Sequence, residues 1–179
     1  QGYGGYIYDG RWVNVAHDLV KKYDLKNGDK FLDVGCAKGF LLYDLKKLYP
    51  ELNVYGVDIS EYAKNNSCKE IRNNIFLGNS NSIDFPDDYF DASVSINTIH
   101  NHDYNNCLKS VKELIRVTKN KKKIFIQVDA YNNDEEKKLF ETWMLTAKTY
   151  LKPFEWLEMF DQANYEGDYF WTTIGFSKE

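Results

Sequence analysis

Cysteine is scarce in this chain, and its scarcity excludes two classes of site. The 179 residues include three cysteines, Cys36, Cys68 and Cys107, which lie far apart. An odd number of widely spaced cysteines indicates neither a disulfide framework nor a zinc centre. We therefore expect no bound metal and a reducing, cytoplasmic location. Because the chain begins with Gln1 rather than Met, its sequence leaves open whether the N-terminus is complete.

Long apolar runs and an excess of positive charge are also missing. No apolar stretch approaches the roughly 20 residues that a membrane-spanning helix needs, so we expect no membrane partner. The net charge is -4, whereas tight binders of nucleic acid usually carry a basic face. The densest basic run, residues 119–123, is interrupted by Asn120 and is typical of a solvated turn. The length fits one domain covering residues 1–179.

Strands and helices are expected to alternate along the chain, judged by the spacing of apolar residues. Alternation of this kind predicts an α/β fold: a Rossmann-like, doubly wound, mostly parallel sheet with helices on both faces. Ligands in such sheets bind beyond the carboxyl ends of the strands. Residues 1–10 read as an irregular arm rich in Gly and Tyr. The expected helices cover about 12–23, 40–49, 60–71, 104–115, 139–147 and 153–164, and the strands 31–34, 53–57, 75–77, 92–96, 123–128 and 169–176.

The strongest local signal is FLDVGCAKG, residues 31–39, which predicts a strand, a glycine turn and a helix. Gly35 and Gly39 let a ligand approach the backbone closely. A dinucleotide fold usually offers G-x-G-x-x-G here, with a pyrophosphate at the helix N-terminus. The carboxylate of Asp33 would repel a pyrophosphate but attract a cationic ligand. A tight turn without any ligand is the alternative.

A second signal, VYGVDIS, occupies residues 54–60. Asp58 ends the expected second strand, where a carboxylate can accept both hydroxyls of a ribose. Its alternative role is to stabilise the N-terminus of the next helix beside Ser60. Asp58 therefore indicates a nucleoside without saying which one.

A third segment, GNSNSIDFPDDYFDASVSINTIH, residues 78–100, completes an ordered set of motifs. With it, the chain resembles the class I S-adenosylmethionine (SAM)-dependent methyltransferases, in particular their small-molecule, UbiE-like (type 11) branch. The resemblance covers roughly residues 11–130 by motif order. Three motifs in family order are more specific than any one of them.

This resemblance implies SAM as cofactor, with S-adenosylhomocysteine (SAH) as product, and assigns residues to it. The methionine end would lie at Asp33, Gly35, Cys36 and Gly39. Two departures are visible: Ala37 replaces a frequent glycine, and Asn79 replaces a common Asp whose role its amide oxygen can still fill. The family also tends to end in two antiparallel strands, and residues 165–176 leave room for either one long strand or a cramped pair. The ribose would meet Asp58 and Ile59, the adenine Asn79 and Ser80, and Asn97 would border the cofactor.

The acceptor side is less clearly marked, because methyl transfer needs mainly alignment and only sometimes a base. His100 is the candidate base, since it follows the fourth expected strand; a backbone-bonded loop histidine is the alternative. Residues 131–152 could hold a lid over the acceptor. The arm could close over the site and attract a sulfonium through its aromatic rings, or remain a loose tail. The candidate acceptor-binding residues are Tyr6, Tyr8, Trp12, His102, Asp129 and Tyr131.

The leading hypothesis is therefore an enzyme that transfers a methyl group from SAM to a small molecule. An RNA methyltransferase of the same fold is an alternative, disfavoured by the acidic balance. A SAM-binding protein without catalysis also stays open, since fold alone does not prove activity. An NAD-dependent oxidoreductase is disfavoured by Asp33 and by the spacing of the glycines.

Overall fold

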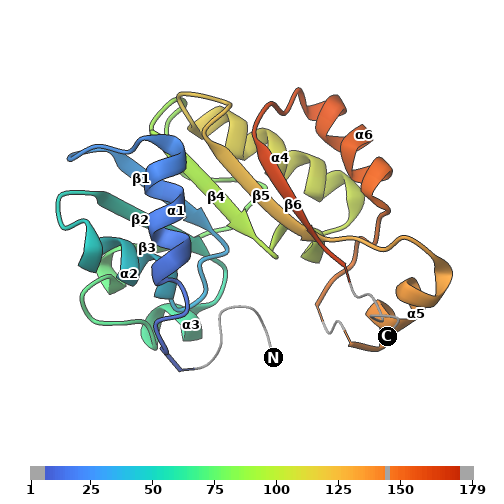
Figure 1. The fold of residues 1–179 in the computed structure, drawn as a ribbon, viewed down its shortest axis with the longest axis horizontal. Coiled ribbons are helices and arrows are strands. Elements are labelled where there is room, and N and C mark those ends of the chain that lie inside the picture. Colours follow the sequence, from blue (N-terminus) through green and yellow to red (C-terminus); the bar gives the residue numbers. More distant parts are fainter. Residues whose placement is uncertain (1–6, 144–145, 174–179) are drawn as a thin grey trace.

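One six-stranded sheet forms the centre of the protein in the computed structural model, which describes residues 7–143 and 146–173 (Figure 1). The strand order is β3-β2-β1-β4-β5-β6, and every described pair of neighbours runs parallel. This confirms the α/β fold expected from the sequence. The strands are β1 (Lys30–Val34), β2 (Asn53–Asp58), β3 (Ile75–Leu77), β4 (Ala92–Ile96), β5 (Ile124–Asp129) and β6 (Asp168–Thr172).

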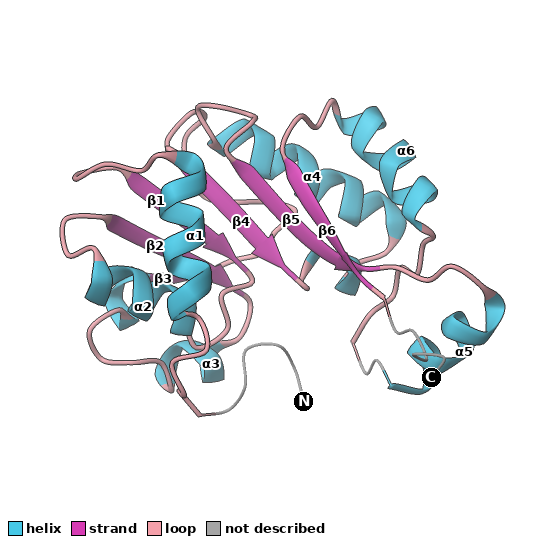
Figure 2. Cartoon of the chain, viewed as in Figure 1, coloured by secondary structure: helices cyan, strands magenta, loops and turns pink. Residues whose placement is uncertain are grey.

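Helices cover both faces of the sheet (Figure 2). Successive residues of a strand point to opposite faces, so Phe31 packs with α1 and α2 while Leu32 packs with α4 and α6. Each face thus has its own apolar core, and the strands are buried between them, as parallel strands require. The longer helices are α1 (Val13–Tyr23), α2 (Phe40–Leu48), α4 (Tyr104–Val117), α5 (Asp134–Trp143) and α6 (Pro153–Ala163).

The third expected helix is much shorter than the sequence predicts. It was expected to run from Ser60 to about Ile71, but α3 covers only Glu61–Asn65, and the 3-10 turn Arg72–Asn74 follows later. Ser60 caps its start through the amide of Ala63, as predicted. The polar residues after it end the helix, because Asn66 donates to the carbonyl of Tyr62 and Ser67 to that of Lys64. Such side-chain bonds compete with helix continuation.

One of the C-terminal elements also differs from expectation. Helix α5 begins at Asp134 rather than near Leu139, because Asn133 caps it by accepting from the amides of Glu135 and Glu136. The expected continuation to Ala147 crosses residues 144–145, which lie outside the described residues. At the C-terminal end β6 is a single strand, one of the two arrangements left open for this segment, and it runs parallel to β5. Residues 174–176 of the expected strand lie outside the described residues.

The carboxyl ends of the strands share one edge of the sheet, towards the bottom of the view (Figure 2). The chain leaves β5 at this edge and leads into α5, which lies beyond it (Figure 1). The residues before α1 approach the same edge. The fold therefore gathers the ends of β1, β2, β3 and β4 where a ligand is expected. No helix in the described part of the chain is both long and apolar enough to cross a membrane.

Candidate functional site

The turn between β1 and α2 is built on left-handed backbone. Gly35 and Gly39 have φ of +81° and +71°, and Ala37 has φ of +48°. A Cβ on Gly35 would lie 2.0 Å from Oγ1 of Thr98, so no side chain fits there. With this φ, Ala37 adopts a conformation that L-residues rarely favour. The turn keeps its backbone open to a ligand.

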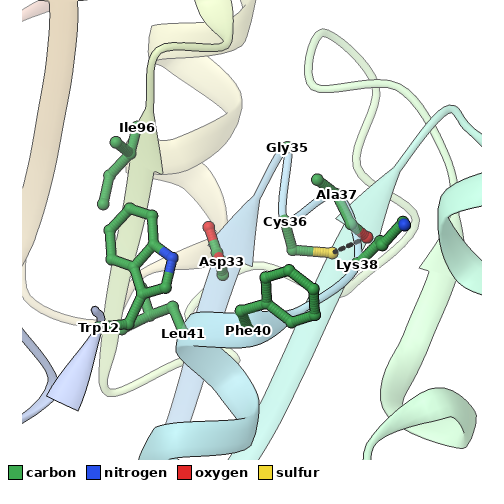
Figure 3. Close-up of a pocket in the computed structure, with 9 residues that line it drawn as sticks. All are labelled: Trp12, Asp33, Gly35, Cys36, Ala37, Lys38, Phe40, Leu41 and Ile96. Carbon is green, nitrogen blue, oxygen red and sulfur yellow. Dashed lines mark hydrogen bonds between the residues drawn. The ribbon is translucent and has the colours of Figure 1, made fainter. Parts of the chain in front are cut away.

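A small cavity of about 50 Å³ lies beside this turn (Figure 3). Asp33 lies within it, between the rings of Trp12 and Phe40. The Asp33 side chain is 5% exposed, and its burial, together with the nearby Asp58 carboxylate, raises its pKa to about 7. A buried carboxylate of this kind favours a cationic ligand, whose charge would replace the lost solvation. The cavity is lined by Trp12, Asp33, Gly35, Cys36, Ala37, Lys38, Phe40, Leu41 and Ile96.

A larger cleft adjoins this cavity and shares Gly35, Ala37 and Ile96 with it. Asp58, at the end of β2, lies in the cleft. Its Oδ2 accepts from the amide of Ala37 at 2.7 Å, and its Oδ1 accepts from the amide of Ser60 at 2.8 Å. Each carboxylate oxygen keeps a second lone-pair direction, so Asp58 can fix the turn and accept from a diol together.

The far wall of the cleft contains the residues predicted to meet a nucleobase. Ile59 is 75% exposed beside Asp58, which offers an apolar surface to a flat ring. Asn79 is exposed after β3. Ser80 differs from the expectation, since its side chain is 5% exposed and its hydroxyl contacts His102 and Ser110, each at 2.9 Å. The structure thus brings Asn79 and Ser80 to the cleft but leaves the Ser80 hydroxyl engaged with protein.

The loop after β4 forms the remaining side of the cleft. Asn97 has φ of +51°, and its buried Oδ1 has no hydrogen-bond partner among the described residues. The same holds for Oδ1 of Asn101. Both residues line the cleft. Buried acceptors without partners are costly, and two of them at one cleft favour a ligand that donates hydrogen bonds.

His100 does not reach this cleft. Its side chain is 2% exposed, and Nε2 lies 3.4 Å from Oδ2 of Asp129. Burial lowers the pKa of His100 to about 4 and raises that of Asp129 to about 6. The backbone carbonyl of His100 accepts from the amides of Lys148 and Thr149. The imidazole therefore supports the loop from within the core, a geometry that does not favour the role of general base predicted for it.

Of the other residues predicted to bind the acceptor, some line the two cavities and some do not. Trp12 lines the smaller cavity and His102 the larger cleft, whereas Asp129 and Tyr131 line neither. Tyr8 also stays outside both. Its hydroxyl donates to the buried carboxylate of Asp44, which raises the Tyr8 pKa to about 12. The arm is thus tied to α2 at Tyr8, and Tyr6 lies outside the described residues.

Comparison with known proteins agrees with this geometry. The sequence profile of a methyltransferase domain family, type 11, matches residues 32–126, which is more than half of the chain. The chain belongs to this family of SAM-dependent methyltransferases. The donor set fits SAM: Asp33 suits its ammonium, Asp58 its ribose, and the cleft between them is open at Gly35. No cluster of metal-binding side chains occurs among residues 7–143 and 146–173.

Three similar proteins place this SAM-dependent methyltransferase among relatives. The uncharacterized methyltransferase YdaC of Bacillus subtilis is 22% identical over 120 residues, which cover 64% of each chain. The ribosomal RNA small subunit methyltransferase G of Lachnoclostridium phytofermentans is 41% identical over 61 residues, 34% of this chain and 25% of the relative. The crystal structure of B. subtilis YcgJ superposes with a TM-score of 0.70 at 18% identity, covering 87% of this chain and 68% of YcgJ. The chain spans less than two thirds of either curated relative.

Several residues that line the two cavities were not predicted from the sequence motifs. Thr98 and Asn101 follow β4 and line the cleft with Asn97, so the motif that predicts Asn97 could also have predicted them. Lys148 gives no signal in the sequence, because only the tertiary fold returns the segment after α5 to the loop at His100. The residues added by the structure are Lys38, Phe40, Leu41, Val57, Gly78, Ile96, Thr98, Asn101 and Lys148.

Proposed function

We propose that this protein transfers the methyl group of SAM to a small-molecule acceptor. One observation carries the proposal: two adjoining cavities place a buried carboxylate, Asp33, at one end and a ribose-type carboxylate, Asp58, further along. This order of groups matches a ligand with a cationic amino-acid end followed by a ribose. A phosphate-containing dinucleotide would bring its negative charge against Asp33.

Each residue of the site has a defined task in this proposal. Asp33 holds the ammonium group, and Trp12 and Phe40 keep water from that contact. Asp58 accepts from the ribose hydroxyls while its bond to Ala37 keeps the turn in place. Asn97 and Asn101 supply acceptors for donors on the ligand or the acceptor molecule.

Chemistry at this site rests on alignment. SAM supplies an activated methyl group on a sulfonium, and the protein must hold a nucleophile in line with that carbon. The residues nearest the turn, Gly35 and Asn97, approach the ligand through their backbone and small side chains, which leaves space for an acceptor. Because His100 lies in the core, an acceptor that must lose a proton would lose it to solvent or would bind already deprotonated.

The small-molecule assignment is supported by charge. The protein has a net charge of -4, and Asp33 and Asp58 add negative charge at the site. An RNA substrate needs a basic surface to offset its phosphates. The match to the relative named for ribosomal RNA covers only 61 residues, a quarter of that relative, so it gives little support to RNA as the substrate of this chain.

Calorimetry tests the cofactor half of this proposal. SAH should bind the purified protein, and NAD should not, because Asp33 repels the pyrophosphate. An Asp33→Asn variant should bind SAH more weakly, with Asp84→Asn, an exposed carboxylate, as the matched control. A folded protein that ignores SAH would overturn the proposal.

The acceptor half needs a second assay. Incubation of protein, SAM and pooled small metabolites should release SAH, and fractionation of the pool should assign the activity to one component. A protein that binds SAH but methylates only RNA in parallel incubations would overturn the small-molecule assignment. One that binds SAH and methylates nothing in either pool would favour a non-catalytic SAM-binding protein.

A further inference from the structure

A chain of hydrogen bonds joins the cleft to helix α4. Nε2 of His102 lies 2.9 Å from Oγ of Ser80, and this oxygen lies 2.9 Å from Oγ of Ser110. The Ser110 hydroxyl in turn lies 2.8 Å from the backbone carbonyl of Asn106. Ser110 is fully buried and Ser80 nearly so, while His102 lines the cleft. The three side chains form a relay with one end at the ligand site.

The number of hydrogens that this relay can donate determines which nitrogen of the His102 imidazole carries the proton. Each serine hydroxyl has one hydrogen to donate. If Ser110 donates to the Asn106 carbonyl, Ser80 donates to Ser110 and Nε2–H of His102 donates to Ser80, all three contacts become hydrogen bonds. The reverse direction loses the bond to the carbonyl. The relay therefore favours His102 with its proton on Nε2 and with Nδ1 as a bare acceptor, for which the described residues offer no partner.

The place of His102 in the cleft follows from the strand order. Asp33 lies one residue before the end of β1, Asp58 ends the neighbouring β2, and Ser80 follows β3, next in the sheet. A ligand with its cationic end at Asp33 and its ribose at Asp58 extends towards β3. Its base then lies beside Ser80, and His102 is bonded to Ser80. His102 thus lies at the nucleobase end of the cleft rather than at the acceptor end predicted from the sequence.

We propose that His102 selects the nucleobase of the cofactor by accepting, through Nδ1, a hydrogen bond from the 6-amino group of adenine. This inference rests on the proposed function, because it requires SAM or SAH in the cleft. Ser80 and Ser110 are positioning residues in it, since they hold the imidazole in the accepting tautomer. Asn79 accepts the second hydrogen of the same amino group.

Burial, more than the nearby charges, keeps His102 in its accepting form. Burial lowers the His102 pKa, Lys148 lowers it further, and Asp103 raises it. Lys148 comes from the segment after α5, and Asp103 caps α4. With the pKa below its ordinary value near 6.5, the imidazole stays neutral at pH 7 and Nδ1 remains free to accept.

Paired ligands that differ only at the base test the proposal. S-inosylhomocysteine differs from SAH only in its base, where a 6-oxo group replaces the 6-amino group and N1 carries a hydrogen. The 6-oxo group would face Nδ1 acceptor to acceptor. Calorimetry at pH 7.5 should show a preference for SAH of about 10–100-fold, as expected for one hydrogen bond replaced by a mismatch. His102→Ala should reduce this preference by about tenfold. His102→Asn, whose amide oxygen can occupy the place of Nδ1, should restore part of it.

Controls separate this role from a general loss of structure. His17→Ala changes an exposed histidine of α1 that is bonded to Tyr49 and does not line the cleft, so the full preference should remain. Because both ligands carry the same ammonium group, the ratio of their affinities is insensitive to Asp33. An unchanged preference in His102→Ala would overturn the inference while leaving SAH binding, and hence the proposed function, intact. A protein that binds neither ligand would instead remove the proposed function.

Nitrogen-15 NMR of the histidine side chains gives an independent readout. The chain has three histidines, so His17→Ala and His102→Ala assign the signals. The His102 spectrum should show a protonated Nε2 and a bare Nδ1 in the ligand-free protein at pH 7.5, and Ser80→Ala should shift it towards a mixture of tautomers. A protonated Nδ1 in the parent protein would overturn the proposal.

Discussion

The ligand-binding role proposed for Asp33 comes with a cost to the stability of the fold. Its pKa is raised to about 7 by burial, with a smaller contribution from Asp58. In the unfolded chain an Asp ionises near pH 3.9. Stability linked to this group is therefore greatest at low pH and is lost as the pH rises from about 4 to 7. Such tension between stability and binding is common at functional sites.

We expect Asp33→Asn to stabilise the ligand-free protein by about 1–3 kcal/mol at pH 8, and far less at pH 4, because the buried charge is removed. The same change should weaken SAH binding, and the rise in SAH affinity from pH 6 to pH 8 should disappear. Thermal denaturation at the two pH values and calorimetry measure both effects. A variant less stable than its parent at pH 8 would contradict this account.

Asp58 holds the amides of Ala37 and Ser60 and, in the proposed function, also binds the ribose; one substitution separates these two roles only in part. Asp58→Ala should weaken SAH binding by about 1–3 kcal/mol, since hydrogen bonds to a charged group have that magnitude. It also leaves the amides of Ala37 and Ser60 without their acceptor, so we expect a moderate loss of stability as well. Asp84→Ala, an exposed acid in the next loop, is the control. Equal SAH affinity in variant and parent would reject the ribose role.

Ala37 carries strain that a smaller residue removes. Its φ of +48° is costly for an L-residue but not for glycine. Ala37→Gly should therefore raise the free energy of unfolding by about 0.5–1 kcal/mol in urea titrations. Ala63→Gly, in the regular backbone of α3, should lower it by about 1 kcal/mol. If Ala37→Gly and Ala63→Gly lower the free energy of unfolding by the same amount, the left-handed conformation of Ala37 is not a source of strain.

At the scale of elements, Arg116 connects α4 to the segment before β4. Its guanidinium donates to the carbonyls of Ile83 and Phe85 at 2.8 Å, and pairs with Glu113 and Asp87 at 2.7 Å. These carboxylates raise the pKa of Arg116 above its ordinary value. The planar fork of an arginine makes four such contacts together, which a lysine cannot do.

We therefore expect Arg116→Lys to destabilise the protein by about 1–3 kcal/mol in urea titrations, although it keeps the charge. Lys119→Ala, which removes a single exposed ion pair with Asp91, should cost less than about 0.5 kcal/mol. A variant as stable as its parent would show that the segment before β4 is held by its apolar contacts alone.

At the scale of the whole molecule, the ligand site unites segments that are distant in sequence. Asp33, Asp58, Ser80 and Asn97 come from the ends of four strands, so a ligand across them links both halves of the sheet. SAH at 100 times its dissociation constant should stabilise the protein by about 2.7 kcal/mol. For a chain of this size the midpoint of thermal unfolding should rise by about 5–10 °C, and NAD should leave it unchanged.

The residues of the two cavities show how far sequence reasoning extends. Asp33, Gly35, Asp58 and Asn79 follow strands that their local sequences predict, so their common location follows from parallel pairing alone. The sequence predicts His100 at the acceptor edge because it follows β4. A position along the chain, however, does not fix the direction of a side chain. In the structure its imidazole turns into the core, beside Asp129.

The sequence by itself determined the alternation of strands and helices and the resemblance to the family, because the period of apolar residues and the turn glycines act locally. Tertiary structure decided which groups are available to a ligand. Ser80 is engaged by His102 and Ser110, and Lys148 reaches the cleft from the segment after α5. These outcomes depend on side chains from separate elements packing together, and a hydrogen bond between residues 22 or 30 positions apart leaves no pattern in the sequence.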